Sequence, residues 1–261
     1  MAAEYSNNLA SLFKRDQIFI LFCLIIVILL SWAYIVHLNS LMQGNSMTSM
    51  AKEMSMPQSN QWTLNEFFSA FLMWSVMMIA MMLPSAMPMI LVFAAVNKKR
   101  LSEGRDFVAT WVFVIGYILI WILFSVFAAS LQWIFHSLAI LSPELKIASP
   151  LISGTVLILA GIYQFTPVKK VCIKNCQAPF GFIVEHWRNG KKGAFVMGLH
   201  HGLFCLGCCW ILMALLFAAG IMNLLWIALI AAFIFVEKIV HIRWVSWIAG
   251  LFLIVFGFVL I

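Results

Sequence analysis

Residues 193–219 read GAFVMGLHHGLFCLGCCWILMALLFAA, a stretch of 27 residues that contains no Asp, Glu, Lys or Arg. An α-helix rises about 1.5 Å per residue, so about 20 apolar residues cross the hydrocarbon core of a bilayer, which is roughly 30 Å thick. The sequence therefore predicts that this stretch forms a transmembrane helix.

Six other apolar stretches are also long enough to span a membrane. The seven predicted spans cover residues 17–38, 66–96, 107–135, 150–166, 193–219, 223–239 and 244–261. We therefore expect an all-α polytopic transmembrane helix bundle, a single integral membrane domain over residues 1–261. The first span is too long for a signal peptide and is interpreted as an anchor. The last two spans have an alternative as a re-entrant hairpin, because Glu237, Lys238, His241 and Arg243 lie around their junction.

The overall composition agrees with a membrane protein. Hydrophobic residues make up 64% of the chain and charged residues 10%, against about 45–50% and about 25% in soluble domains. Disordered, collagen-like and disulfide-scaffold proteins are excluded by the same composition. The net charge of +7 comes from basic residues in short loops, which argues against a nucleic-acid partner. No G-x-x-x-x-G-K-[ST] motif is present, so a nucleotide-driven pump is not expected.

The basic residues also predict the orientation. If the N-terminus is cytoplasmic, 14 of the 16 Lys and Arg residues fall in cytoplasmic loops, and Lys52 and Lys146 remain outside. Positive residues concentrate on the cytoplasmic side of membrane proteins. We therefore expect an N-in, C-out, multi-pass protein of the plasma (inner) membrane.

The span 193–219 carries the densest group of potential metal ligands. These are His200, His201, Cys205, Cys208 and Cys209. At 100° per residue, His201, Cys205 and Cys208 share one helix face, and Cys209 lies at its edge. A thiolate or imidazolium in lipid is costly unless a metal or another partner stabilises it. We interpret the group as metal ligands, with packing and thiol redox chemistry as the alternatives.

The second predicted span is rich in methionine. Met77 and Met81 lie on one helical stripe and Met82 on another, followed by two prolines that break backbone hydrogen bonds. Met82 and Cys208 lie 14 and 15 residues from the inner ends of their spans, at about the same depth. If these two helices are in contact, the methionine and cysteine sulfurs lie close together. The alternative is that the methionine stripe only packs against neighbouring helices.

The predicted outer loop, residues 39–65, contains more methionines in a polar context. They are Met42, Met47, Met50, Met54 and Met56. Thioethers are soft neutral ligands that favour Cu(I) over Mg²⁺, Ca²⁺ or Mn²⁺. We interpret Met47, Met50 and Met54 as Cu(I) ligands; the alternative is an interfacial segment that uses methionine as adaptable apolar filler.

The predicted cytoplasmic loop, residues 167–192, contains Cys172 and Cys176. A reducing cytosol argues against a structural disulfide here. Two thiolates are enough for a two-coordinate Cu(I), whereas a structural zinc site needs four ligands. His186 follows in the same loop and is a further possible ligand. The alternative is a pair of unrelated surface thiols.

Glu237 is the one acidic residue that lies deep enough in a predicted span to need a partner. A carboxylate that binds the second ring nitrogen is the usual support of a histidine ligand. We predict that Glu237 supports His200 or His201 from the second shell of the metal site. The alternative is an interfacial acid paired with Lys238 or Arg243.

These motifs resemble the family of predicted metal-binding integral membrane proteins catalogued as domain of unknown function 2182. The matching segments are AMMLPSA (80–86), YQFTPVKKVCIKNCQAP (163–179), GLFCLGCCWILM (202–213), GIMNLLW (220–226) and Glu237-Lys238. The resemblance implies delivery of copper to a copper-dependent oxidase or oxygenase. It also implies that Cys172, Cys176, Cys205, Cys208, Cys209 and Glu237 hold the family's motif positions. Gln177 stands where the family pattern has Arg, and the outer methionine loop is not part of the pattern.

Three functions compete at this level. The first is a Cu(I) chaperone or insertion factor, not an enzyme, that passes copper between thioether and thiolate ligands in the bilayer. The second is a quinone-linked membrane thiol oxidoreductase that uses Cys205 and Cys208, which have C-x-x-C spacing. The third is an accessory subunit of a membrane oxidase or monooxygenase whose sulfurs only pack.

Overall fold

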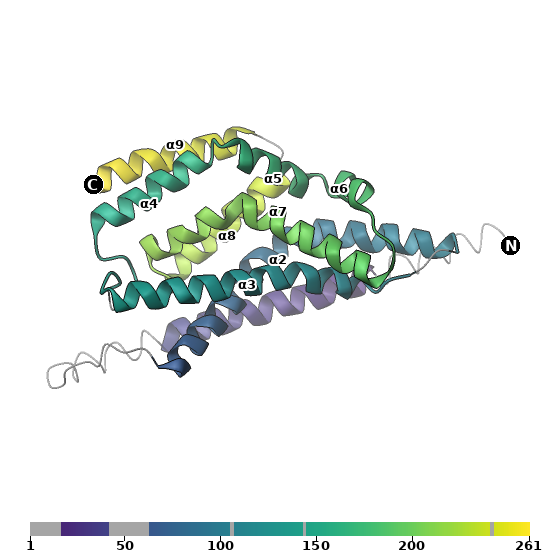
Figure 1. The fold of residues 1–261 in the computed structure, drawn as a ribbon, viewed down its shortest axis with the longest axis horizontal. Helices are drawn as coiled ribbons and strands as arrows, with labels where there is room; N and C mark the ends of the chain where they lie inside the picture. The colour runs from purple at the N-terminus through teal and green to yellow at the C-terminus, as the bar shows by residue number, and fades with distance from the viewer. Residues whose placement is uncertain (1–16, 42–62, 105–106, 143–144, 241–242) are drawn as a thin grey trace.

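The computed structural model describes residues 17–41, 63–104, 107–142, 145–240 and 243–261, and within them the protein is all-α, as expected (Figure 1). An N-terminal helix covers Gln17–Leu41. It is followed by α2 (Leu64–Ser102), α3 (Thr110–Ser137), α4 (Pro150–Tyr163), α5 (Pro167–Gln177), α6 (Pro179–His186), α7 (Gly190–Ala219), α8 (Leu224–Ile239) and α9 (Arg243–Leu260). Met47, Met50 and Met54 lie outside the described residues.

Four helices among the described residues are long and apolar enough to cross a membrane, namely the N-terminal helix, α2, α3 and α7. A fifth span is possible if α4 and α5, which meet at an angle of 65°, count as one broken span. The expectation of several long apolar helices is therefore met. The total of seven spans and the N-in, C-out orientation stay predictions.

The fourth predicted span ends earlier than its hydropathy suggests. Thr166 accepts a hydrogen bond from the backbone N–H of Lys169 and so caps a new helix, and Pro167 occupies its first turn. Proline is tolerated there because the N–H groups of the first turn have no partner within the helix. The chain consequently turns into α5, and residues 167–192, expected as a loop, form α5, α6 and the start of α7.

Helix α7 lies at the centre of the bundle and packs against α3, α4, α5 and α8. Glycines allow α3 and α7 to touch backbone to backbone. A Cβ atom on Gly198 would lie 2.1 Å from the carbonyl oxygen of Phe113, and one on Gly116 would lie 2.4 Å from that of Phe195. Small residues at such contacts are typical of helix packing in membranes. The central position of α7 buries the cysteines that it carries.

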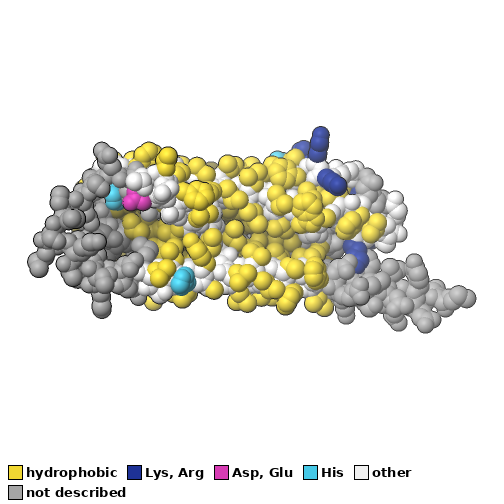
Figure 2. Space-filling model, turned by 90° about the horizontal axis from the view of Figure 1, so that it is seen from below, with side chains coloured by type: hydrophobic (Ala, Val, Ile, Leu, Met, Phe, Trp, Pro, Cys, Tyr) yellow, Lys and Arg dark blue, Asp and Glu magenta, His cyan; other side chains and the backbone are white. Residues whose placement is uncertain are grey.

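The surface in Figure 2 is hydrophobic over its whole middle, and Lys and Arg side chains gather at one end. The C-terminal end of α2, helix α6 and the start of α7 lie at this end in Figure 1. Large apolar side chains of α9 such as Phe252 and Val259 are exposed. An apolar belt with basic residues at one end is the surface expected for helices surrounded by lipid.

Candidate functional site

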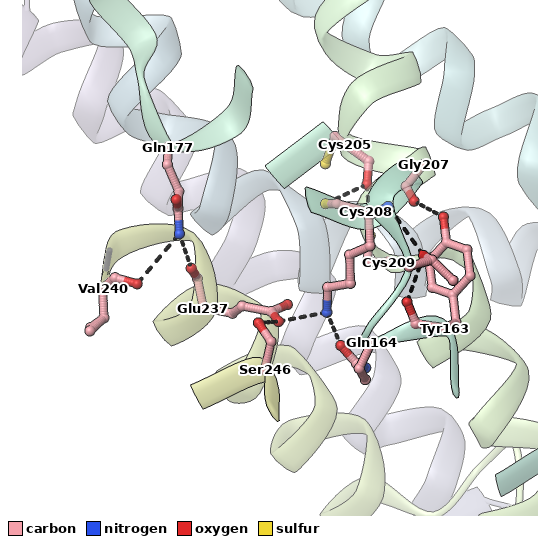
Figure 3. A network of polar contacts seen from close by, with 12 residues as sticks. Tyr163, Gln164, Gln177, Cys205, Gly207, Cys208, Cys209, Glu237, Val240 and Ser246 are labelled. Atoms are coloured by element: carbon pink, nitrogen blue, oxygen red, sulfur yellow. Dashed lines mark hydrogen bonds and ion pairs between the residues drawn. The ribbon is translucent and has the colours of Figure 1, made fainter. Parts of the chain in front are cut away.

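The three cysteines of α7 lie together on its buried face. Cys205 and Cys208 are 1% exposed and Cys209 is fully buried. The thiols of Cys208 and Cys209 donate hydrogen bonds to the backbone carbonyl of Cys205, at 3.0 and 2.9 Å (Figure 3). Helical periodicity thus brings the three sulfurs to one side of α7.

Helix α5 adds a fourth thiol to this group. The side chain of Cys176 is buried and lies next to those of Cys205 and Cys208 on α7. Cys172 packs against α7 where Gly207 leaves room, because a Cβ atom there would lie 2.7 Å from the Cys172 sulfur. Two cysteines of α5 and three of α7, about thirty residues apart in the sequence, therefore meet at the contact between these helices. We name Cys172, Cys176, Cys205, Cys208 and Cys209 the cysteine cluster.

Helix α2 brings a thioether to the cysteine cluster. The sulfurs of Met82 and Cys209 are 3.9 Å apart, so these two side chains of α2 and α7 meet. Met77 and Met81 are buried in the same hydrophobic core. Met82 is thus the predicted methionine that the structure places in contact with a thiol.

A buried lysine lies next to Cys205. The sequence did not predict this contact. Lys238 of α8 places its Nζ atom 2.8 Å from the Cys205 sulfur and 2.9 Å from the hydroxyl oxygen of Ser85. The Tyr117 hydroxyl lies 3.2 Å from the same sulfur and donates a hydrogen bond to the Met82 carbonyl. A positive charge so close to sulfur stabilises negative charge there. A signal was present in the sequence, since a lysine inside an apolar span needs an interior partner.

Glu237 points toward α5, not toward a histidine (Figure 3). Its carboxylate accepts a hydrogen bond from the Lys169 ammonium at 2.5 Å and another from the Ser246 hydroxyl. Lys169 and Glu237 are 1% and 3% exposed, and Lys169 also donates to the side chain of Gln164. The Gln177 amide donates to the Glu237 carbonyl at 2.8 Å. Glu237 therefore holds both ends of α5, and its predicted role as the support of His200 or His201 is replaced by this contact with Lys169.

Substituting Glu237 with Gln is expected to destabilise the protein by about 3–5 kcal/mol, because the Lys169 ammonium is then left buried without its counter-charge. Thermal unfolding of the purified protein in detergent measures the loss. The double variant Lys169→Met/Glu237→Leu should recover most of it. Glu185→Gln, at an exposed position of α6, is the control. A Glu237→Gln variant as stable as the wild type would show that the pair does not fix α5.

The two predicted histidines face different neighbours. His201 is 2% exposed and its ring stacks on Tyr117, with centroids 5.4 Å apart. Its Nδ1 atom is buried without a hydrogen-bond partner among the described residues. His200 is half-buried and its ring contacts that of His186.

Within the described residues, no three His, Cys, Asp or Glu side chains are arranged to hold a metal ion together. A closed four-ligand site of the structural zinc type is therefore absent from this part of the chain. The cysteine cluster instead offers thiols in pairs, a thioether and a neighbouring ammonium. Such soft donors suit Cu(I), which is stable with few ligands.

No curated protein and no solved structure matches the chain in comparisons with known proteins. A family model described as PpoB2, copper chaperone, matches residues 71–260, well over half of the chain and every helix of the cysteine cluster. The protein therefore belongs to this family of copper chaperones.

Proposed function

We propose that the protein is a Cu(I) chaperone embedded in the plasma (inner) membrane and that it delivers copper to a copper-dependent oxidase or oxygenase. The contact between the thiols of Cys176, Cys205 and Cys208 carries this proposal. These sulfurs come from two helices, are buried away from water, and have a thioether beside them. Thiolate and thioether are soft ligands, which favour Cu(I) over hard ions such as Mg²⁺, Ca²⁺ and Mn²⁺.

Transfer of copper requires ligands that can be exchanged one at a time. The cysteine cluster suits this because Cys172 is partly exposed, whereas Cys176 is buried beside Cys205 and Cys208. Cys172 can bind Cu(I) before the ligand of the copper donor leaves. Cys176 can then replace Cys172 and pass the ion to Cys205 or Cys208. The copper remains bound to sulfur at each step.

Lys238 sets the charge of the loaded site. Two thiolates and one Cu(I) carry a net charge of −1, which is unfavourable in a medium of low dielectric constant. The Lys238 ammonium, 2.8 Å from Cys205, neutralises that charge. The site thus matches a monovalent ion with two thiolate ligands, and the net charge would be positive with a divalent ion in its place.

The proposal is tested on the full-length protein in lipid nanodiscs, loaded anaerobically with Cu(I) in the presence of a competing chelator. X-ray absorption at the copper edge should show a shell of two or three sulfur atoms. A protein that binds no Cu(I) under these conditions, or binds it through nitrogen and oxygen alone, would refute the proposal.

A further inference from the structure

Two histidines meet where α6 packs beside α7, outside the cysteine cluster. His186 is the last residue of α6, and His200 lies in the first half of α7. Their ring centroids are 5.9 Å apart and the ring planes are nearly perpendicular, at 85°. Both side chains are half-buried, so neither is fully shielded from an additional ligand.

The His186 ring is held in one orientation. It stacks on Phe182 with centroids 4.7 Å apart, and its Nδ1 atom lies 3.1 Å from the Phe182 carbonyl oxygen. Because a carbonyl oxygen only accepts, Nδ1 carries the proton in this contact. The lone pair of the neutral ring is then on Nε2, as in histidines whose second nitrogen is fixed by a backbone carbonyl when they bind metals.

The spacing of the two rings fits a shared metal ion. With metal–nitrogen bonds of about 2.0–2.1 Å and roughly 1.1 Å from nitrogen to ring centre, a bridging ion separates two ring centres by up to about 6.3 Å. The observed 5.9 Å lies just inside this limit.

We infer that His186 and His200 form a second copper site, in which two imidazole nitrogens bind the ion and water or a donor's ligand completes its coordination. This inference rests on the proposed function for the identity of the metal, since imidazole also suits zinc and nickel. Because its two donors are neutral and only half-buried, this site should bind copper more weakly than the cysteine cluster and be more accessible.

The position of the pair relates it to the cysteine cluster. His200 precedes Cys205 by five residues of α7, a rise of about 7.5 Å along the helix. The buried His201 lies between them in the sequence, and its Nδ1 atom lacks a partner among the described residues. Copper held by His186 and His200 is thus close to the sulfur ligands while remaining outside the buried group.

The test uses the full-length variant Cys176→Ser/Cys205→Ser/Cys208→Ser loaded with Cu(I) alone, without a competing chelator. This variant should bind copper with an imidazole contribution in its X-ray absorption spectrum. Adding His186→Ala and His200→Ala should abolish that imidazole contribution and lower the bound copper by one ion per chain. His136→Ala is the control, because it lies at the C-terminal end of α3, at the opposite end of the molecule in Figure 1. Absence of an imidazole contribution in the thiol-deleted variant, or its persistence after both histidine substitutions, would overturn the inference.

A second measurement covers the case in which the thiol-deleted variant does not fold. In the otherwise wild-type protein, His186→Ala/His200→Ala should lower the copper bound without chelator by one ion per chain and leave the sulfur-bound copper unchanged. An unchanged total would again overturn the inference. Failure of the proposed function has a different signature, since the wild-type protein would then show no sulfur-bound copper at all.

Discussion

Replacing Cys205 and Cys208 together with serine is expected to raise the dissociation constant for Cu(I) by more than about 100-fold. Residues that only support a metal ligand already contribute 10–100-fold to affinity, and these two thiols are proposed to bind the ion directly. Serine keeps the size of the side chain but offers a hard oxygen, which Cu(I) does not favour. In this variant Cys176 remains on α5, but the two thiols next to it, with which it is proposed to bind Cu(I), are gone.

The affinity is measured by anaerobic competition with a chromophoric Cu(I) chelator. Cys23→Ser is the matched control, because Cys23 is an exposed cysteine on the N-terminal helix. Thermal unfolding of both variants separates a loss of ligands from a loss of structure. A folded double variant that binds copper as tightly as the wild type would end the chaperone proposal. If it instead lost a thiol-dependent quinone reduction, the oxidoreductase alternative would gain support.

The long helices could be predicted because hydropathy alone determines them. The N-terminal helix, α2, α3 and α7 are continuous apolar stretches, and the ends of their predicted ranges lie within six residues of those in the structure. The end of the fourth span at Thr166 was predicted, but helix α5 was not, because residues 167–177 include three lysines and were expected to form a loop. The turn is specified by Thr166 and Pro167, which are local signals that a hydropathy window averages out.

The sequence predicted the cysteines of α5 and those of α7 as two separate groups, not as one cluster. Helical periodicity places Cys205, Cys208 and Cys209 on one side of α7, but it carries no information about what faces them. The contact with Cys176 depends on how α5 folds back, and that in turn depends on the Lys169–Glu237 pair and on Gly207. Such long-range pairings arise from tertiary packing, which a single sequence does not reveal.

The two adjacent charges of α8 show the same limit. Glu237 and Lys238 both looked like candidates for one ion pair near the end of a span. In the structure they point to different partners, Glu237 to Lys169 and Lys238 to Cys205. Neighbouring residues on a helix are about 100° apart, so they face different elements. The sequence indicated that the charges needed partners, and the fold determined which ones.

Replacing Lys238 with methionine is expected to weaken Cu(I) binding by about 10–100-fold, the range found for groups that support metal ligands. Without the ammonium, a copper ion with two thiolates leaves an uncompensated negative charge in the core of the bundle. Methionine has a similar length and is tolerated in apolar surroundings, so the fold should survive. Lys238→Arg keeps the positive charge and should retain more of the affinity than Lys238→Met.

The opposite result would have an equally clear meaning. Lys238 lies 2.8 Å from the Cys205 sulfur, so the rival expectation is that its ammonium competes with copper for that thiolate. In that case the Lys238→Met variant would bind Cu(I) more tightly than the wild type. That result would contradict the proposal that this lysine compensates the charge of the loaded site. The competition assay separates the two outcomes by the direction of the change in affinity. Lys174→Met, which removes an exposed charge from α5, controls for the effect of net charge alone. Compensation therefore predicts weaker binding for Lys238→Met and unchanged binding for Lys174→Met, because only the first charge touches a sulfur ligand.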